Sequence, residues 1–304
     1  MTTTRREFLA SAGRFGAFLA VAPALPEPTM QDTPLFKISL AEWSLHRALM
    51  SGTLDHMDFA RVAREDFGLD AIEYVNSFFR DRAGQFDYLE GMRKRADDQG
   101  VRSLLIMVDG EGDLASSDDG RRRKAIENHF KWVAAAAYLG CHSIRVNATG
   151  SGEYEEQKKR AADSLVHLAD MAEPYGTNII VENHGGLSSN GTWLAAVMQM
   201  ADHPRVGTLP DFGNFRLGGG KEYDRYKGVE QLMPWAKAVS AKSHEFDAFG
   251  NETRTDYKRM MQIVIEASYH GYVGIEYEGS QFPEMEGIRR TKKLLENVRM
   301  QLNG

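Results

Sequence analysis

The chain has 304 residues, of which 42% are hydrophobic and 26% charged, as in an ordinary globular protein with one large domain or two modest ones. Its formal net charge of −6 and its pI of about 5.9 give no reason to expect a nucleic-acid partner. Cys141 is the only cysteine, which excludes a disulfide within the chain.

The N-terminal segment carries a pattern typical of export. The sequence TRREFL at 4–9 matches a twin-arginine signal, and a weakly apolar stretch interrupted by Arg14 follows it. That stretch is too short for a stable transmembrane helix. We therefore expect residues 1–28 to form a signal peptide and linker and residues 29–304 to form one domain. The mature protein would be periplasmic or otherwise extracytoplasmic, without a stable membrane anchor.

Short apolar runs and longer stretches with helical spacing alternate along the rest of the chain. The apolar runs predict strands at 36–40, 71–75, 102–108, 141–147, 179–181, 206–210, 238–243 and 272–275. The helical spacing predicts helices within 55–67, 86–99, 118–139, 154–175, 192–201, 227–235, 256–268 and 284–302.

This alternation predicts parallel strands joined by crossover helices. Eight such units fit a single-domain α/β fold, the (β/α)8 TIM barrel, whose active site lies at the C-terminal ends of the strands. A doubly wound open sheet is the alternative. It is disfavoured because no glycine-rich phosphate loop follows the first strand.

Four successive predicted strands each end in a residue that can bind a metal. These residues are Glu182, Asp211, His244 and Glu276. Ionisable groups at the end of a buried strand are costly without a partner such as a metal. Three carboxylates and one imidazole suit Mn²⁺, with Mg²⁺, Co²⁺ or Zn²⁺ as alternatives, and argue against a thiolate site. The competing interpretation is that these acids form ion pairs at the strand ends.

Two further residues share a strand face with these candidates. His184 lies two residues after Glu182, so we expect it to reach the mouth for acid–base or substrate contact, or to donate a hydrogen bond that orients a ligand. Lys242 lies two residues before His244. It could pair with a substrate oxyanion or hydroxyl, or form a salt bridge to Glu276 or Glu278.

Other polar and aromatic residues near the strand ends are predicted to contact a substrate. They are Trp43, His46, Arg145, Asn147 and Asn214. Phe78, Trp193 and Phe246 are further candidates for the pocket wall, although aromatic residues of this kind more often lie in a core.

At this point the sequence resembles a known group of proteins. The segments IVENH at 180–184, LPDFGNF at 209–215, AKSH at 241–244 and GIEYEG at 274–279 are similar to those of the xylose isomerase-like barrel superfamily. Its members are also described as sugar phosphate isomerases and epimerases. The resemblance covers essentially the whole mature chain.

The resemblance implies one divalent metal held by Glu182, Asp211, His244 and Glu276, and a carbohydrate substrate whose carbonyl and hydroxyl oxygens bind that metal. It also implies proton transfer by Glu182 and Glu276 on opposite faces of the substrate carbon, through an enediolate, with His184 as a further acid or base. The partner expected is a small sugar or sugar derivative. A homo-oligomer is left open.

Two positions depart from the epimerases of that superfamily. Asn214 stands where those enzymes usually carry a histidine, and Gly250 stands where they usually carry an arginine. A keto-sugar lyase or dehydratase on the same metal site therefore remains an alternative to an isomerase or epimerase. A non-catalytic exported sugar-binding barrel is the alternative from another functional class.

Overall fold

The computed structural model describes residues 34–303. The twin-arginine pattern at 4–9 and the predicted boundary between residues 28 and 29 lie outside these residues. Both stay predictions.

Eight parallel strands form one curled sheet, as the alternation of apolar and helical stretches predicted. The strands are β1 (Lys37–Ala41), β2 (Ala71–Val75), β3 (Arg102–Met107), β4 (Ser143–Val146), β5 (Asn178–Glu182), β6 (Val206–Leu209), β9 (Val239–Ser243) and β10 (Tyr272–Tyr277). Their order is β6-β5-β4-β3-β2-β1-β10-β9. Parallel bridges from Thr208 to Ala236 and from Asp211 to Ser240 join the two edge segments and close the barrel.

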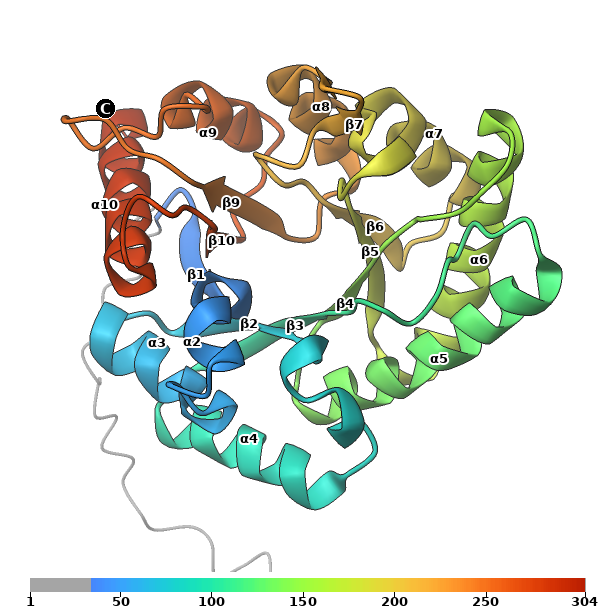
Figure 1. Ribbon diagram of the computed structural model, residues 1–304, viewed down its shortest axis with the longest axis horizontal. Coiled ribbons are helices and arrows are strands. Elements are labelled where there is room, and N and C mark those ends of the chain that lie inside the picture. Colours follow the sequence, from blue (N-terminus) through green and yellow to red (C-terminus); the bar gives the residue numbers. More distant parts are fainter. Residues whose placement is uncertain (1–33, 304) are drawn as a thin grey trace, which may run out of the picture. The chain divides into compact units, whose positions relative to one another are not determined.

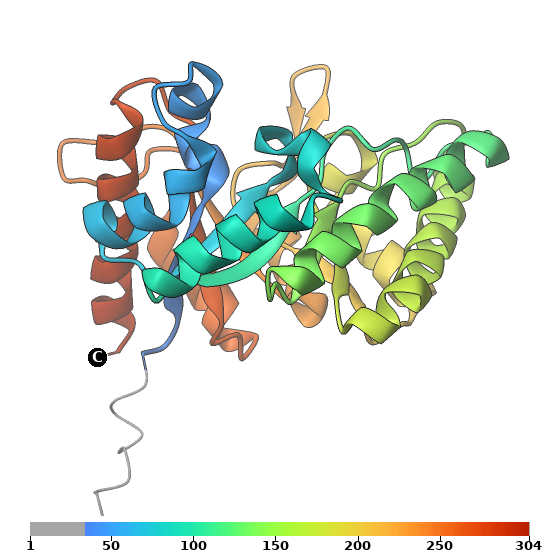
Figure 2. The same ribbon diagram turned by 90° about the horizontal axis from the view of Figure 1, so that it is seen from below.

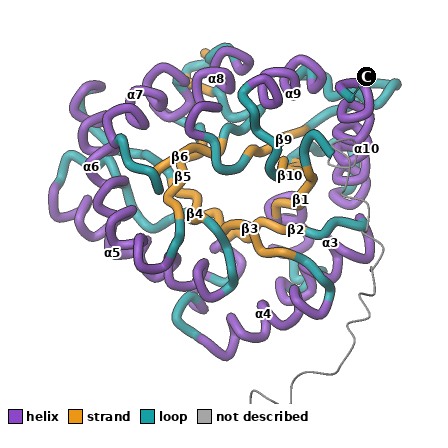
Figure 3. Tube along the Cα trace, turned by 180° about the vertical axis from the view of Figure 1, so that it is seen from behind, coloured by secondary structure: helices purple, strands orange, loops and turns teal. Residues whose placement is uncertain are grey.

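Helices surround the strands in Figures 1 and 3. They are α2 (His46–Met50), α3 (Phe59–Phe67), α4 (Phe86–Asp98), α5 (Asp119–Tyr138), α6 (Tyr154–Ala172), α7 (Gly191–Ala201), α8 (Arg225–Leu232), α9 (Tyr257–Glu266) and α10 (Glu284–Leu302). Short 3-10 turns lie at Glu42–Leu45, His56–Asp58, Asn76–Phe78, Arg80–Arg82, Glu173–Tyr175, Gly186–Ser189 and Met233–Trp235. No helix within residues 34–303 is long and apolar enough to cross a membrane.

Local sequence explains where several helices begin. The side chains of Asp118, Asn190, Asp224 and Asp256 each accept a hydrogen bond from a backbone amide in the first turn of α5, α7, α8 and α9. Such caps satisfy amides that have no partner inside the helix. At the other end of α3, Gly68 takes the left-handed conformation, with φ of 65°, that a residue with a side chain rarely adopts.

The apolar core has an outer and an inner part. The outer part packs the helices against the strands and includes Phe36, Trp132 and Trp193. The inner part fills the barrel with Ala41, Val75, Leu105, Met107, Ile180, Leu209 and Ala238. Trp43 and Phe78 pack against this inner cluster and are only partly buried.

A short antiparallel hairpin follows β6 and was not predicted. It consists of β7 (Arg216–Gly218) and β8 (Lys221–Glu222) and stands out from the ring of helices in Figure 2. Gly218, Gly219 and Gly220 all have positive φ, which explains why three glycines occur at this turn.

Candidate active site

Three buried carboxylates meet at the C-terminal ends of the strands. Glu182 ends β5, Asp211 follows β6, and Glu276 lies on β10. One oxygen from each lies within 4.8 Å of the other two, and the residues are 1%, 0% and 4% exposed. Glu182 lies two residues after Ile180 of the inner core, so strand alternation turns its side chain into the barrel. We call these three residues the acidic triad.

A tight turn fixes Asp211. Its Oδ1 accepts hydrogen bonds from the backbone amides of Gly213 at 2.8 Å and Asn214 at 2.7 Å. Its own amide donates to Asn183 Oδ1 at 2.8 Å, and the Asn183 side-chain amide donates to the Asp211 carbonyl at 3.0 Å. The segment after β6 therefore leaves Asp211 Oδ2 as the oxygen that faces the other acids.

Ser240 on β9 bridges two acids of the triad. Its Oγ lies 2.8 Å from Asp211 Oδ2 and 2.7 Å from Glu276 Oε2. A hydroxyl has one proton, so both hydrogen bonds form together only if one carboxyl is protonated. Burial, aided by the charges of Glu182 and Glu276, raises the pKa of Asp211 to about 8 against the opposing effect of Lys242. Burial therefore favours a proton on Asp211, and the Ser240 hydroxyl is placed to donate to Asp211 Oδ2 or to Glu276 Oε2.

Lys242 places an ammonium group against the triad. Its Nζ lies 3.0 Å from Glu276 Oε1, 3.3 Å from Glu278 Oε2 and 3.9 Å from Asp211 Oδ2, and the residue is 2% exposed. Burial disfavours the charge, but the neighbouring carboxylates, Glu276 first, hold the pKa of Lys242 well above its usual value. Burial likewise disfavours ionisation of Glu276, yet the Lys242 charge and the Ser240 hydroxyl together lower the pKa of Glu276. Of the two roles that the sequence allowed for Lys242, the salt bridge to Glu276 and Glu278 is therefore present.

Arg145 on β4 supplies a second buried cation. Its NH1 donates to Asp109 Oδ1 at 2.7 Å, and Asn147 donates to the same oxygen at 2.7 Å. Burial opposes ionisation of Asp109, but Arg145 and Asn147 outweigh it and lower the pKa of Asp109 to about 2. Arg145 and Asn147 were predicted to contact substrate, and the structure places both on Asp109. Asp109 itself was not predicted as a site residue, although it too follows an apolar run.

Glu182 keeps one oxygen without a hydrogen bond. Its Oε1 accepts from the side-chain amide of Asn214 at 2.9 Å. Its Oε2 lies 2.9 Å from Arg145 Nε, but the two atoms are not aligned and neither has a hydrogen-bond partner among the described residues. Arg145 therefore balances the charge of this buried carboxylate without a well-aligned hydrogen bond.

The structure does not bring His244 into the acidic triad. His244 follows β9, and its Nε2 lies 3.8 Å from Glu278 Oε2. Burial, aided by the positive charge of Arg254, lowers the pKa of His244 to about 4, so the imidazole is neutral at neutral pH. Neutral imidazole is the form that binds metals. The predicted role of His244 as a metal ligand stays a prediction.

An aromatic group lies beside Glu278. Trp43 stacks on His46, with ring centroids 5.0 Å apart and an interplanar angle of 15°, and lies 6.0 Å from Phe78. Trp43 Nε1 donates to Glu278 Oε1 at 2.5 Å. These partly buried rings are placed to form a wall of the mouth. Trp193 and Phe246, in contrast, belong to the outer core.

His184 lies beyond the end of β5 and is exposed. Its backbone amide donates to Ser188 Oγ at 3.1 Å. The prediction placed its side chain on the strand face of Glu182. The strand ends at Glu182, so the alternation on which that reasoning relied does not extend to His184. Its role in acid–base chemistry stays a prediction.

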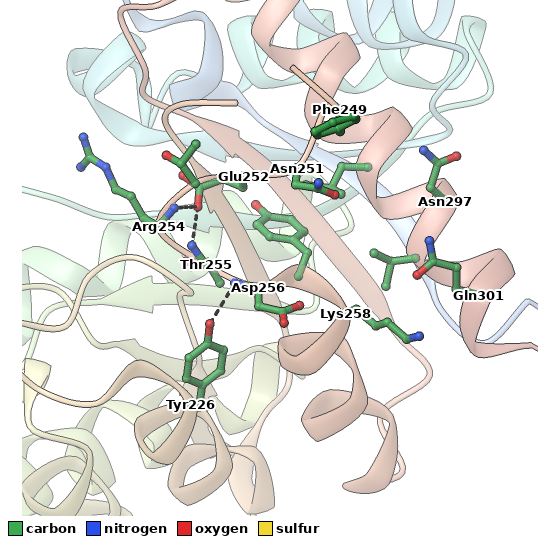
Figure 4. A pocket seen from close by; sticks show the side chains of 15 residues that line it. Tyr226, Phe249, Asn251, Glu252, Arg254, Thr255, Asp256, Lys258, Asn297 and Gln301 are labelled. Carbon is green, nitrogen blue, oxygen red and sulfur yellow. Dashed lines mark hydrogen bonds between the residues drawn. The ribbon is translucent and has the colours of Figure 1, made fainter. Parts of the chain in front are cut away.

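A cavity of about 680 Å³ lies away from the acidic triad, between the loop after β9 and α10 (Figure 4). None of the predicted site residues lines it. Glu252 organises this loop by accepting hydrogen bonds from the amides of Arg254 at 2.7 Å and Thr255 at 2.6 Å. It also lies 3.3 Å from the His244 amide, so the loop helps to fix the backbone at His244.

A family model described as xylose isomerase-like TIM barrel matches residues 60–298. The chain belongs to the xylose isomerase-like TIM barrel family. This confirms the resemblance of the four sequence segments and the predicted barrel. A comparison with curated protein sequences found no match.

Solved structures share the fold at low sequence identity. The 3-keto-D-glucoside 4-epimerase from E. coli is 15% identical, with a TM-score of 0.66, and the match covers 86% of this chain and 99% of that one. The probable 3-DHS dehydratase from Bacillus anthracis is 18% identical, with a TM-score of 0.64 and coverage of 86% and 99%. A xylose isomerase-like barrel protein from Mycobacterium smegmatis in complex with magnesium is 16% identical, with a TM-score of 0.64 and coverage of 88% and 98%.

The donor set of this xylose isomerase-like barrel fits a divalent cation. Three carboxylate oxygens converge, from Glu182 at the end of β5, from Asp211 after β6 and from Glu276 on β10. Carboxylate oxygens are ligands for Mg²⁺ and Mn²⁺. Glu276, rather than Glu278, joins Glu182 and Asp211, as the sequence predicted. The acidic triad is therefore a candidate metal site.

Proposed function

We propose that this barrel is a sugar isomerase or epimerase that uses one divalent metal ion. The observation that carries the proposal is the acidic triad, which brings Glu182 and Glu276 together from different sides of the barrel. Two carboxylates that flank one point can take a proton from a carbon and return one to it. The TM-score of 0.66 to a 3-keto-D-glucoside 4-epimerase supports the fold needed for such a site.

Glu182, Asp211 and Glu276 would hold the metal, with His244 as a further candidate ligand. A divalent ion held there supplies Lewis-acid polarisation of a substrate carbonyl and thus makes the neighbouring C–H more acidic. We expect Mn²⁺, with Mg²⁺, Co²⁺ or Zn²⁺ as alternatives. Metal ligands must be deprotonated, and because burial raises the pKa of Asp211, metal binding should strengthen as the pH rises.

The side chains of the site have distinct tasks in this proposal. Glu276 has a lowered pKa, so it is ionised at neutral pH and can accept a proton. Glu182, held by Asn214, lies on the other side, where it could pass a proton taken up from water to the substrate carbon. The wall formed by Trp43, His46 and Phe78 offers an apolar face against which a sugar ring can stack.

Solvent deuterium exchange into a panel of sugars tests the proposal. The panel includes free ketoses and 3-keto sugars, and the protein is loaded with Mn²⁺. We expect deuterium at the carbon next to the carbonyl of at least one sugar, together with a new isomer or epimer. Binding of a sugar with no exchange would instead support a non-catalytic sugar-binding barrel.

A keto-sugar lyase or dehydratase is the second candidate. Asn214 occupies the position at which the related epimerases usually carry a histidine, and here it holds Glu182 instead of offering an imidazole to substrate. The fold match to a probable 3-DHS dehydratase supports the same candidate. Elimination of water would yield a product lighter than the substrate by one water molecule, whereas an isomer or epimer keeps the mass, so mass spectrometry of the same reactions distinguishes the two.

A further inference from the structure

The ammonium group of Lys242 lies where a metal ion would have to approach the acidic triad. We propose that the Lys242 ammonium and a divalent metal ion are alternative occupants of this site, and that the ammonium withdraws toward Glu278 when the metal binds. Lys242 would then set the metal affinity of the barrel. This inference rests on the metal site of the proposed function.

The distances support a shared position. Lys242 Nζ lies 3.0 Å from Glu276 Oε1 and 3.9 Å from Asp211 Oδ2, so it contacts two of the three acids that would hold the metal. An ammonium and a divalent ion cannot both approach these oxygens without strong repulsion, which is large where water is excluded. Lys242 is 2% exposed and Asp211 is 0% exposed.

The surrounding chain is shaped to hold the lysine. A Cβ added at Gly213 would lie 3.1 Å from both Cγ and Cδ of Lys242, so the glycine leaves room for the aliphatic part of the side chain. The Tyr257 hydroxyl lies 2.9 Å from the Lys242 carbonyl and 3.0 Å from the Ala241 carbonyl, where it can donate a hydrogen bond. These contacts fix the backbone at Lys242 and leave the position of its ammonium to the neighbouring carboxylates.

Glu278 offers the ammonium a second partner. Its Oε2 lies 3.3 Å from Lys242 Nζ, and its Oε1 is held by Trp43. The side chain of Glu278 is 27% exposed, whereas that of Glu276 is 5% exposed. Moving from Glu276 to Glu278 therefore takes the ammonium toward solvent without leaving it unpaired.

Calorimetric titration with MnCl₂ after chelator treatment tests the inference without measuring activity. We expect Lys242→Met to bind Mn²⁺ at least about tenfold more tightly than the wild type, because the competing cation is gone. Its melting temperature should be lower without metal and should rise more on Mn²⁺ addition. The matched control is Lys237→Met. Lys237 donates to the Pro204 carbonyl at 2.9 Å, at the N-terminal end of β9, and should leave the affinity unchanged.

A double-mutant cycle with Glu278→Gln shows whether the ammonium acts through Glu278. In the wild-type background, Glu278→Gln should weaken Mn²⁺ binding, because the displaced ammonium loses its second partner. In the Lys242→Met background it should have no effect. An equal loss in both backgrounds would make Glu278 a metal ligand and would overturn the withdrawal of Lys242.

The remaining outcomes are also decisive. If Lys242→Met folds only when Mn²⁺ is present, the metal replaces the ammonium and the inference stands. If the wild type binds Mn²⁺ and folded Lys242→Met binds it no more tightly, the inference is wrong while the metal site survives. If neither protein binds Mn²⁺, both the inference and the metal in the proposed function are wrong.

Discussion

The side-chain amide of Asn214 donates a hydrogen bond to Glu182 Oε1 at 2.9 Å. Asn214 lies in the turn after β6, and its backbone amide also donates to Asp211 Oδ1. One residue therefore orients two of the three acids that would hold the metal.

Replacing Asn214 by alanine tests this role. Asn214→Ala should keep the turn at Asp211 but free the Glu182 carboxylate to rotate. Partners that orient metal ligands are typically worth about 10- to 100-fold in metal affinity or activity. Mn²⁺ titration measures the loss. Asn251→Ala is the control, because Asn251 donates to Asp247 in an exposed part of the loop after β9 and should leave the affinity unchanged. Equal affinities in both variants would contradict the role of Asn214.

Glu73 makes the stability of the metal-free protein depend on pH. It lies inside the barrel, 1% exposed, and accepts a hydrogen bond from Ser39 Oγ at 2.6 Å, while its Oε2 has no partner among the described residues. Gly274 makes room for it, since a Cβ there would come within 2.5 Å of Glu73 Oε1. Burial raises the pKa of Glu73 from 4.5 to about 8 despite the Ser39 hydrogen bond.

The sign of the effect follows from proton linkage. Between pH 4.5 and about 8 the folded state binds the Glu73 proton more tightly than the unfolded state, so this stabilisation is complete below pH 4.5 and lost as the pH rises to about 8. Glu73→Gln should remove this contribution. Urea unfolding with a chelator present should show the variant gaining stability relative to the wild type between pH 5 and about 8. A constant difference over that range would refute the shifted pKa.

Arg145 is predicted to be essential for stability because it lies between two acids. Arg145→Met would leave the buried Glu182 and the partly exposed Asp109 without their cation, and breaking a buried pair such as that with Glu182 costs about 3–5 kcal/mol. Arg61→Met is the control, because the ion pair of Arg61 with Glu65 is exposed and worth about 0–1 kcal/mol. Urea unfolding compares the two. Adding Asp109→Asn to Arg145→Met should recover part of the loss, and no recovery would exclude this explanation.

The sequence predicted the strands and the acidic triad for the same physical reason. Parallel strands that are buried on both faces have continuous apolar sequences. In a closed barrel, the polar residues at their C-terminal ends lie at the same mouth. Glu182, Asp211 and Glu276 therefore could be found without coordinates. The hairpin of β7 and β8 lacks such a run and was therefore not predicted.

The side-chain partners could not be predicted in the same way. For Lys242 the sequence allowed a substrate contact or a salt bridge, because the choice depends on distances between β9 and β10. His184 and His244 lie just past strand ends, where the period of two no longer fixes the direction of a side chain. Arg145 and Asn147 were predicted to contact substrate. Their observed partner, Asp109, follows the neighbouring strand β3, and a contact between two strands is not visible in the sequence.

The export pattern supplies a separate prediction. We propose that the chain leaves the cytoplasm by the twin-arginine route, because TRREFL at 4–9 matches its signal. Changing Arg5 and Arg6 together to lysine should keep the protein in the cytoplasm, as shown by fractionation of expressing cells. An Arg14→Lys variant controls for the loss of an arginine and should be exported as before. Normal export of the double variant would refute the route.

The last prediction concerns the two glutamates of the proposed reaction. A carboxylate that holds a divalent cation is a weak base. The increased acidity of the substrate C–H must therefore outweigh the loss of basicity of the carboxylate. The charge that develops in the transition state must be stabilised more strongly than the ground state. Glu276→Gln should therefore keep much of the substrate affinity while kcat falls by about 10²- to 10⁴-fold, the range for a placed acid or base.

Three variants separate the possible routes of the proton. Glu182→Gln and Glu276→Gln should both lose kcat if the two carboxylates act on opposite faces. Turnover near the wild-type rate in both, with metal still bound, would make this mechanism wrong. His184→Ala distinguishes epimerisation from elimination. Because His184 is exposed beyond the end of β5, two-glutamate epimerisation predicts a small effect. A loss of kcat as large as that of Glu276→Gln would instead favour elimination assisted by the imidazole.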